Sequence, residues 1–130
     1  MQDLIARADK VARLLKHRSE SVAVAESSTG GLIAAALLAL PGASAYFLGG
    51  AVVYTQVARR ALLDVPDLAK LGMRAATEPY ALLLAQTARQ RFSAHWAVAE
   101  SGAVPARPGT DTAMRPATAA SRLPGQPTAQ

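Results

Sequence analysis

The sequence predicts a layered α/β domain, in which helices pack against a β-sheet. Hydrophobic residues make up 51% of the chain but aromatic residues only 5%, a composition that suits helices packed on a sheet. Short β-branched runs alternate with longer segments of helical period, and the runs end in polar residues. A length of 130 residues is enough for one domain with a core of its own.

The first half of the chain predicts a helix, a strand and a second helix. Residues 2–17 carry apolar side chains at helical spacing with charges on the opposite face, the pattern of an amphipathic helix. "SVAVA" at 21–25 is short, alternating and bounded by polar residues, which indicates a strand. We expect a buried helix over 29–40, terminated by the following Pro-Gly pair.

The second half repeats this order. "GGAVVYT" at 49–55 predicts a strand, and "VARRALLDV" at 57–65 predicts the helix after it. A further helix is expected to begin at Thr77, with a proline in its first turn, and to run to about Phe92. "HWAVAES" at 95–101 predicts a third strand that again ends in Glu-Ser.

Composition and charge limit the class of protein. The chain has no cysteine, which excludes disulfides and thiolate metal sites and fits a reducing compartment. Neither a secretion-signal pattern nor an apolar run long enough to span a bilayer is visible, so we expect a cytoplasmic protein without a membrane partner. The net charge of +5 comes from dispersed cations, which favours a solvated basic surface over nucleic-acid binding. A basic nucleic-acid-binding protein is therefore the weakest of three functional hypotheses.

Two polar loops, 26–31 and 100–103, are candidates for a site. In α/β sheets ligands collect beyond the carboxyl ends of the strands, where both loops would lie. Free backbone N–H groups at a helix start, beside the hydroxyls of 27–29 and the glycines at 30 and 31, suit a phosphate or an oxyanion. The alternative is a structural helix cap with a packing pair of glycines. The loop has neither the Walker ending nor the Gly-x-Ser-x-Gly pattern.

The remaining polar residues predict structural roles. His17 and His95 stand apart from any carboxylate or cysteine cluster, so we expect no metal site. Glu26 and Glu100 end neighbouring strands and would form a pair of acids there. We expect Glu26 to orient the loop through hydrogen bonds, and Glu100 either to act similarly or to face solvent.

Several motifs in order resemble one known family. "AESSTGG", "GGAVVYTQVARRALLDV", "ATEP" and "AVAESGA" together resemble the C-terminal domain of the competence/damage-inducible protein CinA, from residue 1 to about Ala103. The resemblance implies a three-layer α/β/α sandwich that is commonly oligomeric. It also implies hydrolysis of the carboxamide of nicotinamide mononucleotide to nicotinate mononucleotide and ammonia, without a metal or another cofactor.

The resemblance also implies roles for individual residues. Ser27 would be the nucleophile, Tyr54 would belong to the catalytic group, and Arg59 falls where the family has a lysine. The residues expected to bind substrate are Glu26, Ser28, Thr29, Gly30, Gly31, Thr77, Ser101 and Gly102.

Arg59 departs from the family pattern. A desolvated lysine can accept a proton from serine, whereas arginine stays protonated. Arg59 would then either hold Tyr54 partly as phenolate or be a solvated cation on a helix surface. The alternative function is accordingly a catalytically inactive relative that binds a nucleotide or a partner subunit.

The chain also departs from the family after residue 103. Residues 104–130 are rich in Pro, Ala, Thr, Gly and Arg, so we predict a low-complexity, disordered tail after a domain at 1–103. The family continues with a strand and a closing helix. A two-base shift at Val104 with GC-rich codons restores such a pattern, and we hypothesise that the tail is a frameshift product. Loss of these elements predicts exposed apolar sheet surface and reliance on a partner.

Overall fold

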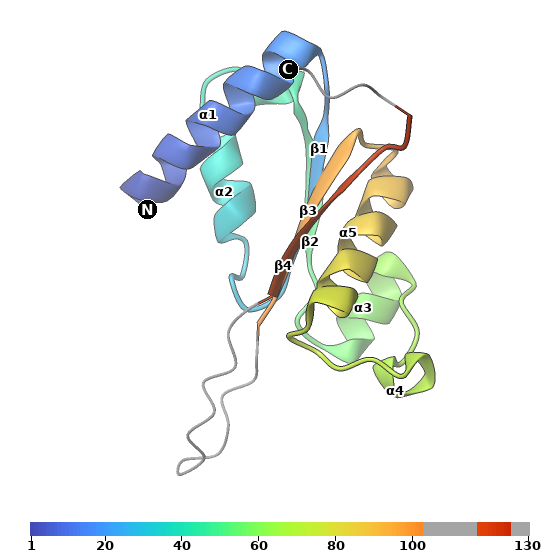
Figure 1. Cartoon of the computed structure of the whole chain (residues 1–130). Coiled ribbons are helices and arrows are strands. Elements are labelled where there is room, and N and C mark those ends of the chain that lie inside the picture. The colour runs from blue at the N-terminus through green and yellow to red at the C-terminus, as the bar shows by residue number, and fades with distance from the viewer. Residues whose placement is uncertain (103–116, 126–130) are drawn as a thin grey trace.

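A four-stranded sheet forms the middle layer of the computed structural model, which describes residues 1–102 and 117–125 (Figure 1). In the described residues, the strands lie in the order β2-β1-β3-β4. Their bounds are β1 Val22–Glu26, β2 Phe47–Val52, β3 Trp96–Ser101 and β4 Ala117–Arg122. β1 pairs in parallel with both β2 and β3, whereas β4 is antiparallel to β3.

Two helices cover one face of the sheet. They are α1 (Gln2–Arg18) and α2 (Leu32–Leu38), which lie on the same side of the sheet in Figure 1. Ala8, Ala12 and Leu15 are the buried side chains of α1, and they belong to one core cluster with Val22 and Val24 of β1. The apolar face that the sequence predicts for this helix is therefore only partly buried, because Val11 and Leu14 remain exposed.

The other face is covered by α3 (Gln56–Leu63) and α5 (Glu78–Phe92), with the single turn α4 (Leu68–Leu71) between them. Buried residues of α5 pack against the alanines of the central strands, at 25, 97 and 99. Small side chains on this face of the sheet let a helix approach closely. The predicted three-layer α/β/α architecture is confirmed.

The expected elements are present, with shifted ends. The helix predicted over 29–40 begins only at Leu32, because Gly30 and Gly31 take left-handed φ values of 62° and 104°. α3 begins one residue before its predicted start, since the Thr55 hydroxyl accepts a hydrogen bond from the amide of Ala58 at 3.1 Å.

The prediction that no strand follows residue 103 is wrong, because 117–122 form β4. β4 pairs with β3 along its length and lies against α5. The Ser121 hydroxyl accepts a hydrogen bond from Arg89 Nε at 3.3 Å. A strand with one neighbour is held by backbone hydrogen bonds, so a low apolar content does not prevent it. Of the predicted disordered tail, 104–116 and 126–130 lie outside the described residues.

Across residues 1–102 and 117–125, no helix combines the length and apolar character that a membrane crossing requires.

Candidate functional site

The predicted site residues from three strands meet at one edge of the sheet. Glu26 pairs with Val52 and Ala25 pairs with Ala99, so β1, β2 and β3 end side by side. The amide of Val53 also donates to the carbonyl of Glu26 at 2.7 Å, which extends the pairing. Ser27, Tyr54 and Ser101 therefore lie at the carboxyl edge of three parallel strands, where α/β domains bind their ligands.

Glu26 ends β1 and caps the helix that follows. Its carboxylate is only 1% exposed and accepts hydrogen bonds from the amides of Ile33 at 2.8 Å and Ala34 at 3.1 Å. These amides lie in the first turn of α2 and have no acceptor within the helix. Glu26 thus orients the loop, as expected, and its burial removes it from contact with a substrate.

Glu100 holds the same loop from the neighbouring strand. Its carboxylate, also 1% exposed, accepts hydrogen bonds from the amides of Ser27 at 2.9 Å and Thr29 at 3.1 Å. The Ser28 hydroxyl donates to its other oxygen. The hydroxyl of Thr29 lies 2.8 Å from an oxygen of Glu26 and 2.8 Å from an oxygen of Glu100. Its single proton can serve one of the two at a time.

The environment of Glu100 favours its charged form. Burial by itself raises the pKa of Glu100, but hydrogen bonds from Ser28, from the Ser27 amide and from Thr29 lower it by more. The net result is a pKa below the ordinary value. The loop amides and the Glu100 carboxylate therefore stabilise one another.

This arrangement corrects the expected phosphate site. Two buried carboxylates already occupy the start of α2, so an anionic phosphate there would meet negative charge and engaged donors. The amides of Thr29 and Gly30 are likewise engaged, by Glu100 and by the carbonyl of Ser27. In the described part of the loop, the amides of Ser28 and Gly31 donate no hydrogen bond to another described residue.

The second predicted loop packs directly on the first. A Cβ atom added at Gly102 would lie 1.8 Å from the Ser28 hydroxyl oxygen, so this position requires glycine. Ser101 is buried, and its hydroxyl accepts a hydrogen bond from the amide of Ala76 at 3.1 Å. This bond brings Thr77, the cap residue of α5, to the same edge of the sheet. Ser101 and Gly102 thus shape the site by packing. The Ser101 hydroxyl is buried and bonded to Ala76, and Gly102 has no side chain that could contact a ligand.

The proposed catalytic side chains differ in their surroundings. Tyr54 is 56% exposed at the end of β2, and Ser27 is half-buried with its hydroxyl unbonded to any other described residue. The Arg59 guanidinium lies 5.6 Å from the ring centre of Tyr80. Arg59 and Tyr54 both lie in the described part of the chain, and no hydrogen bond joins them. Arg59 therefore makes no hydrogen bond that would stabilise a Tyr54 phenolate, contrary to one of the two expected roles of Arg59.

Arg59 and Tyr80 form a pair that the sequence did not reveal. Tyr80 is 1% exposed, and neither its hydroxyl nor the buried Nε of Arg59 has a hydrogen-bond partner among the described residues. Burial raises the pKa of the Tyr80 phenol, and the charge of Arg59 lowers it by less. A guanidinium over an aromatic face is held by cation–π attraction, which fixes Arg59 against α5.

Within the described ranges, no group of three or more histidine, cysteine, aspartate or glutamate side chains is arranged to hold an ion.

Comparison with known proteins decides the family. A profile of the CinA C-terminal domain matches residues 5–116, which is most of the chain and extends past residue 103. The chain belongs to the CinA C-terminal domain family. The predicted resemblance is confirmed, and the match reaches further along the chain than the quoted motifs do.

Relatives of this CinA domain come from several bacteria. The chain is 42% identical over 109 residues to a CinA-like protein of Prochlorococcus marinus (strain MIT 9313), which covers 84% of this chain and 25% of that protein. It is 47% identical over 109 residues to a CinA-like protein of Mycobacterium marinum, covering 83% of this chain and 24% of that protein. The chain thus spans about a quarter of the length of these curated relatives.

Solved structures carry the same fold. The competence/damage inducible protein CihA from Agrobacterium tumefaciens superposes with a TM-score of 0.79 at 33% identity, covering 95% of this chain and 76% of that chain. A competence damage-inducible protein A (ComA) from Klebsiella pneumoniae superposes with a TM-score of 0.73 at 25% identity.

We predict that the Glu100 carboxylate makes loop stability dependent on pH. Because the folded-state pKa is lowered, its contribution is present above the ordinary value of 4.5 and is lost as the pH falls through the folded-state pKa. Glu100→Gln should therefore lower the free energy of unfolding at pH 7 by about 1–3 kcal/mol, measured by urea titration. The difference from the unmodified chain should shrink below pH 4.5.

Glu78→Gln is the matched control, since Glu78 is exposed and its side chain makes no hydrogen bond or ion pair to another described residue. Its effect should stay below about 1 kcal/mol. Equal losses in the two variants, or a Glu100→Gln difference that persists unchanged in acid, would contradict this role of Glu100.

Proposed function

We propose that this carboxyl-edge site hydrolyses the carboxamide of nicotinamide mononucleotide, with Ser27 as the nucleophile. The observation that carries the proposal is the state of the Ser27 hydroxyl. Its amide is fixed by Glu100, whereas the hydroxyl itself is half-buried and unbonded to other described residues. The bond to Glu100 positions the Ser27 backbone for attack, and the unbonded hydroxyl requires a proton acceptor to activate it.

The proposed reaction has two steps. The Ser27 oxygen forms a bond to the carboxamide carbon while its proton passes, by way of a proton acceptor, to the carboxamide nitrogen, and the C–N bond then breaks to release ammonia. Water cleaves the resulting ester and gives nicotinate mononucleotide. Tyr54, which follows the adjacent strand at the same edge of the sheet, is the side chain that we propose takes part in the proton transfer. The amides of Ser28 and Gly31 support the proposal as donors to the developing oxyanion.

We expect Ser27→Ala to abolish ammonia release from nicotinamide mononucleotide. Removing the nucleophile should lower kcat by on the order of 10³-fold or more, measured with a coupled ammonia assay. Ser44→Ala is the matched control, because Ser44 is exposed in the short 3-10 turn Ala43–Ala45 that precedes β2 at the opposite edge of the sheet. Ammonia release that survives Ser27→Ala would overturn the assignment of the nucleophile.

A second candidate function is nucleotide binding without turnover. Arg59 favours it, because a guanidinium does not give up its proton and this one is held over Tyr80. A lysine at the same position would be able to lose a proton when desolvated. Calorimetry that detects nucleotide binding by a chain without ammonia release would identify this second function.

Arg59→Lys is expected to raise ammonia release by about 10²-fold, the scale of one proton-transfer group. Arg60→Lys tests the same exchange on the exposed residue beside it and should leave the rate unchanged. If both variants behave alike, proton transfer at position 59 does not limit the reaction.

A further inference from the structure

A polar cavity lies at the amino edge of β3, on the α5 side of the sheet. Its volume of about 360 Å³ is within the range of about 300–1,000 Å³ that is typical of small-molecule pockets. The end of α5, the start of β3 and the residue after β4 line it, with Arg89, Gln90, Ser93, Ala94, His95 and Leu123. The six residues of β3, which span about 20 Å, separate this cavity from the carboxyl edge that carries Ser27.

Arg89 is a buried cation without a counter-ion. It is only 9% exposed, and no carboxylate among the described residues forms an ion pair with it. Its Nε donates to the Ser121 hydroxyl, whereas its two terminal nitrogens have no hydrogen-bond partner in the described part of the chain. Neither terminal nitrogen is sealed from solvent, so both are available to a ligand in the cavity. Because an unpaired buried charge is costly, an anion at this position would stabilise the protein.

His95 provides a second hydrogen-bond donor. The amide of Ser21 donates to Nδ1 of His95 at 3.0 Å, so the neutral imidazole carries its proton on Nε2. No described residue accepts a hydrogen bond from this Nε2. Since His95 lines the cavity, its Nε2–H can donate to an acceptor there.

The rim of the cavity supplies neutral donors and no negative charge. Gln90 and Ser93 contribute a side-chain amide and a hydroxyl, and no carboxylate is among the lining residues. The carbonyls of Arg89 and Gln90, at the end of α5, accept hydrogen bonds from the amides of Ala94 and Ser93. These bonds cap the negative end of the helix, which would otherwise repel an anion.

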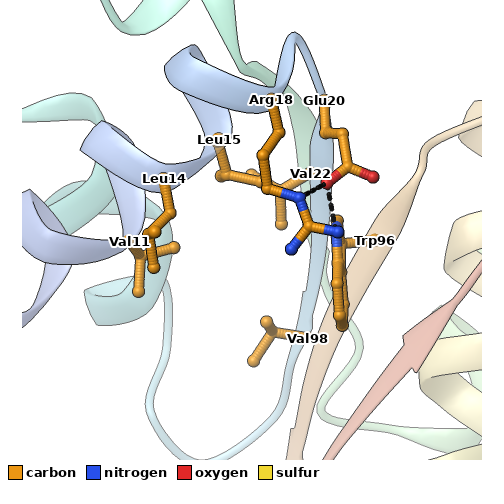
Figure 2. Close-up of a pocket in the computed structure, with 8 residues that line it drawn as sticks. All are labelled: Val11, Leu14, Leu15, Arg18, Glu20, Val22, Trp96 and Val98. Carbon is orange, nitrogen blue, oxygen red and sulfur yellow. Dashed lines mark hydrogen bonds and ion pairs between the residues drawn. The ribbon is translucent and has the colours of Figure 1, made fainter. Parts of the chain in front are cut away.

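Glu20, the acid that precedes Ser21, is engaged elsewhere. Figure 2 shows its carboxylate on the α1 side of the sheet, where it pairs with Arg18 and accepts a hydrogen bond from Nε1 of Trp96. It also lies 3.9 Å from a terminal nitrogen of Arg122. Glu20 therefore does not neutralise Arg89.

We propose that this cavity binds the phosphate group of a small anionic ligand. The two terminal nitrogens of Arg89 would donate to two phosphate oxygens, in the forked geometry that a guanidinium favours. His95 Nε2 and the Ser93 hydroxyl would donate to the remaining oxygens. A carboxylate has only two oxygens and would leave part of this donor set unused. The inference does not depend on the proposed hydrolysis, which takes place at the other edge of the sheet.

An NMR titration of the full chain with inorganic phosphate, at pH 7 and constant ionic strength, tests the site. The amide signals of Ser93, Ala94 and His95 should shift and saturate. Acetate should bind about tenfold more weakly, because it cannot engage all the donors. Glycerol phosphate is the second probe, and the tighter of the two phosphate ligands identifies the source as the free ion or a phosphate ester.

Two variants locate the phosphate. Gln90→Glu puts a negative charge on the rim and should weaken phosphate binding by about tenfold or more. Gln86→Glu is the matched control, because Gln86 is an exposed glutamine of the same helix that does not line the cavity. Binding by this control should stay within about twofold of the unmodified chain.

Arg89→Met removes the buried charge at nearly constant length and should abolish the saturable shifts. Circular dichroism verifies that each variant is folded. Gln90 is exposed, so Gln90→Glu keeps the test valid if Arg89→Met fails to fold.

Several results would overturn the proposal. They are the absence of saturable shifts with either phosphate ligand, equal binding of acetate, equal binding by the two glutamate variants, or binding that persists in folded Arg89→Met. Shifts confined to residues 27–31 would instead assign the phosphate to the carboxyl edge, which separates this proposal from the proposed hydrolysis.

Discussion

Two buried glutamates at the ends of neighbouring strands hold the loop on which the rest of the site depends. Burying a carboxylate is costly unless hydrogen bonds compensate for the lost water. Glu26 meets this cost with the first-turn amides of α2, and Glu100 meets it with the amides of Ser27 and Thr29. The loop therefore cannot rearrange without leaving charged oxygens unpaired. The same bonds that fix the Ser27 backbone also consume most of the donors at the helix start.

This constraint directs the chemistry of the edge toward hydroxyls. With the helix start occupied by carboxylates, the loop has few donors left for a phosphate. In the described part of the loop, the groups without a hydrogen bond are the Ser27 hydroxyl and the amides of Ser28 and Gly31. Tyr54 lies exposed beside them, whereas Arg59 is turned toward Tyr80. Arg59, where the resemblance implies a lysine, lies over Tyr80 and makes no hydrogen bond to the described part of the loop, so this departure leaves the scaffold of the loop intact.

The sequence was sufficient for the elements that depend on local patterns. Hydrophobic period, Thr77 and the Pro-Gly pair after residue 40 predicted α1, α2, α3 and α5 and three of the strands within a few residues, but not the single turn α4. The sequence did not predict contacts between segments that lie far apart in the chain. The reach of Glu100 to residues 27–29 depends on the register of β1 and β3, and the match of Glu-Ser at both strand ends was its visible sign.

Other features left still less trace in the sequence. β4 consists of small and polar residues whose place is set by the backbone of β3, so hydrophobic patterning gave no indication of it. The contact between Arg59 and Tyr80 joins two helices that periodicity alone cannot orient. By contrast, the expected exposure of apolar sheet surface agrees with the partial exposure of Trp96 and Val98 on β3.

An NMR titration of the Glu100 carboxyl carbon tests the central claim most directly. If this carboxylate holds the loop, its midpoint will lie below 4.5, and the amide signals of Ser27 and Thr29 will shift with that same midpoint. A midpoint at or above 4.5, or loop amides that do not follow the titration, would contradict the account.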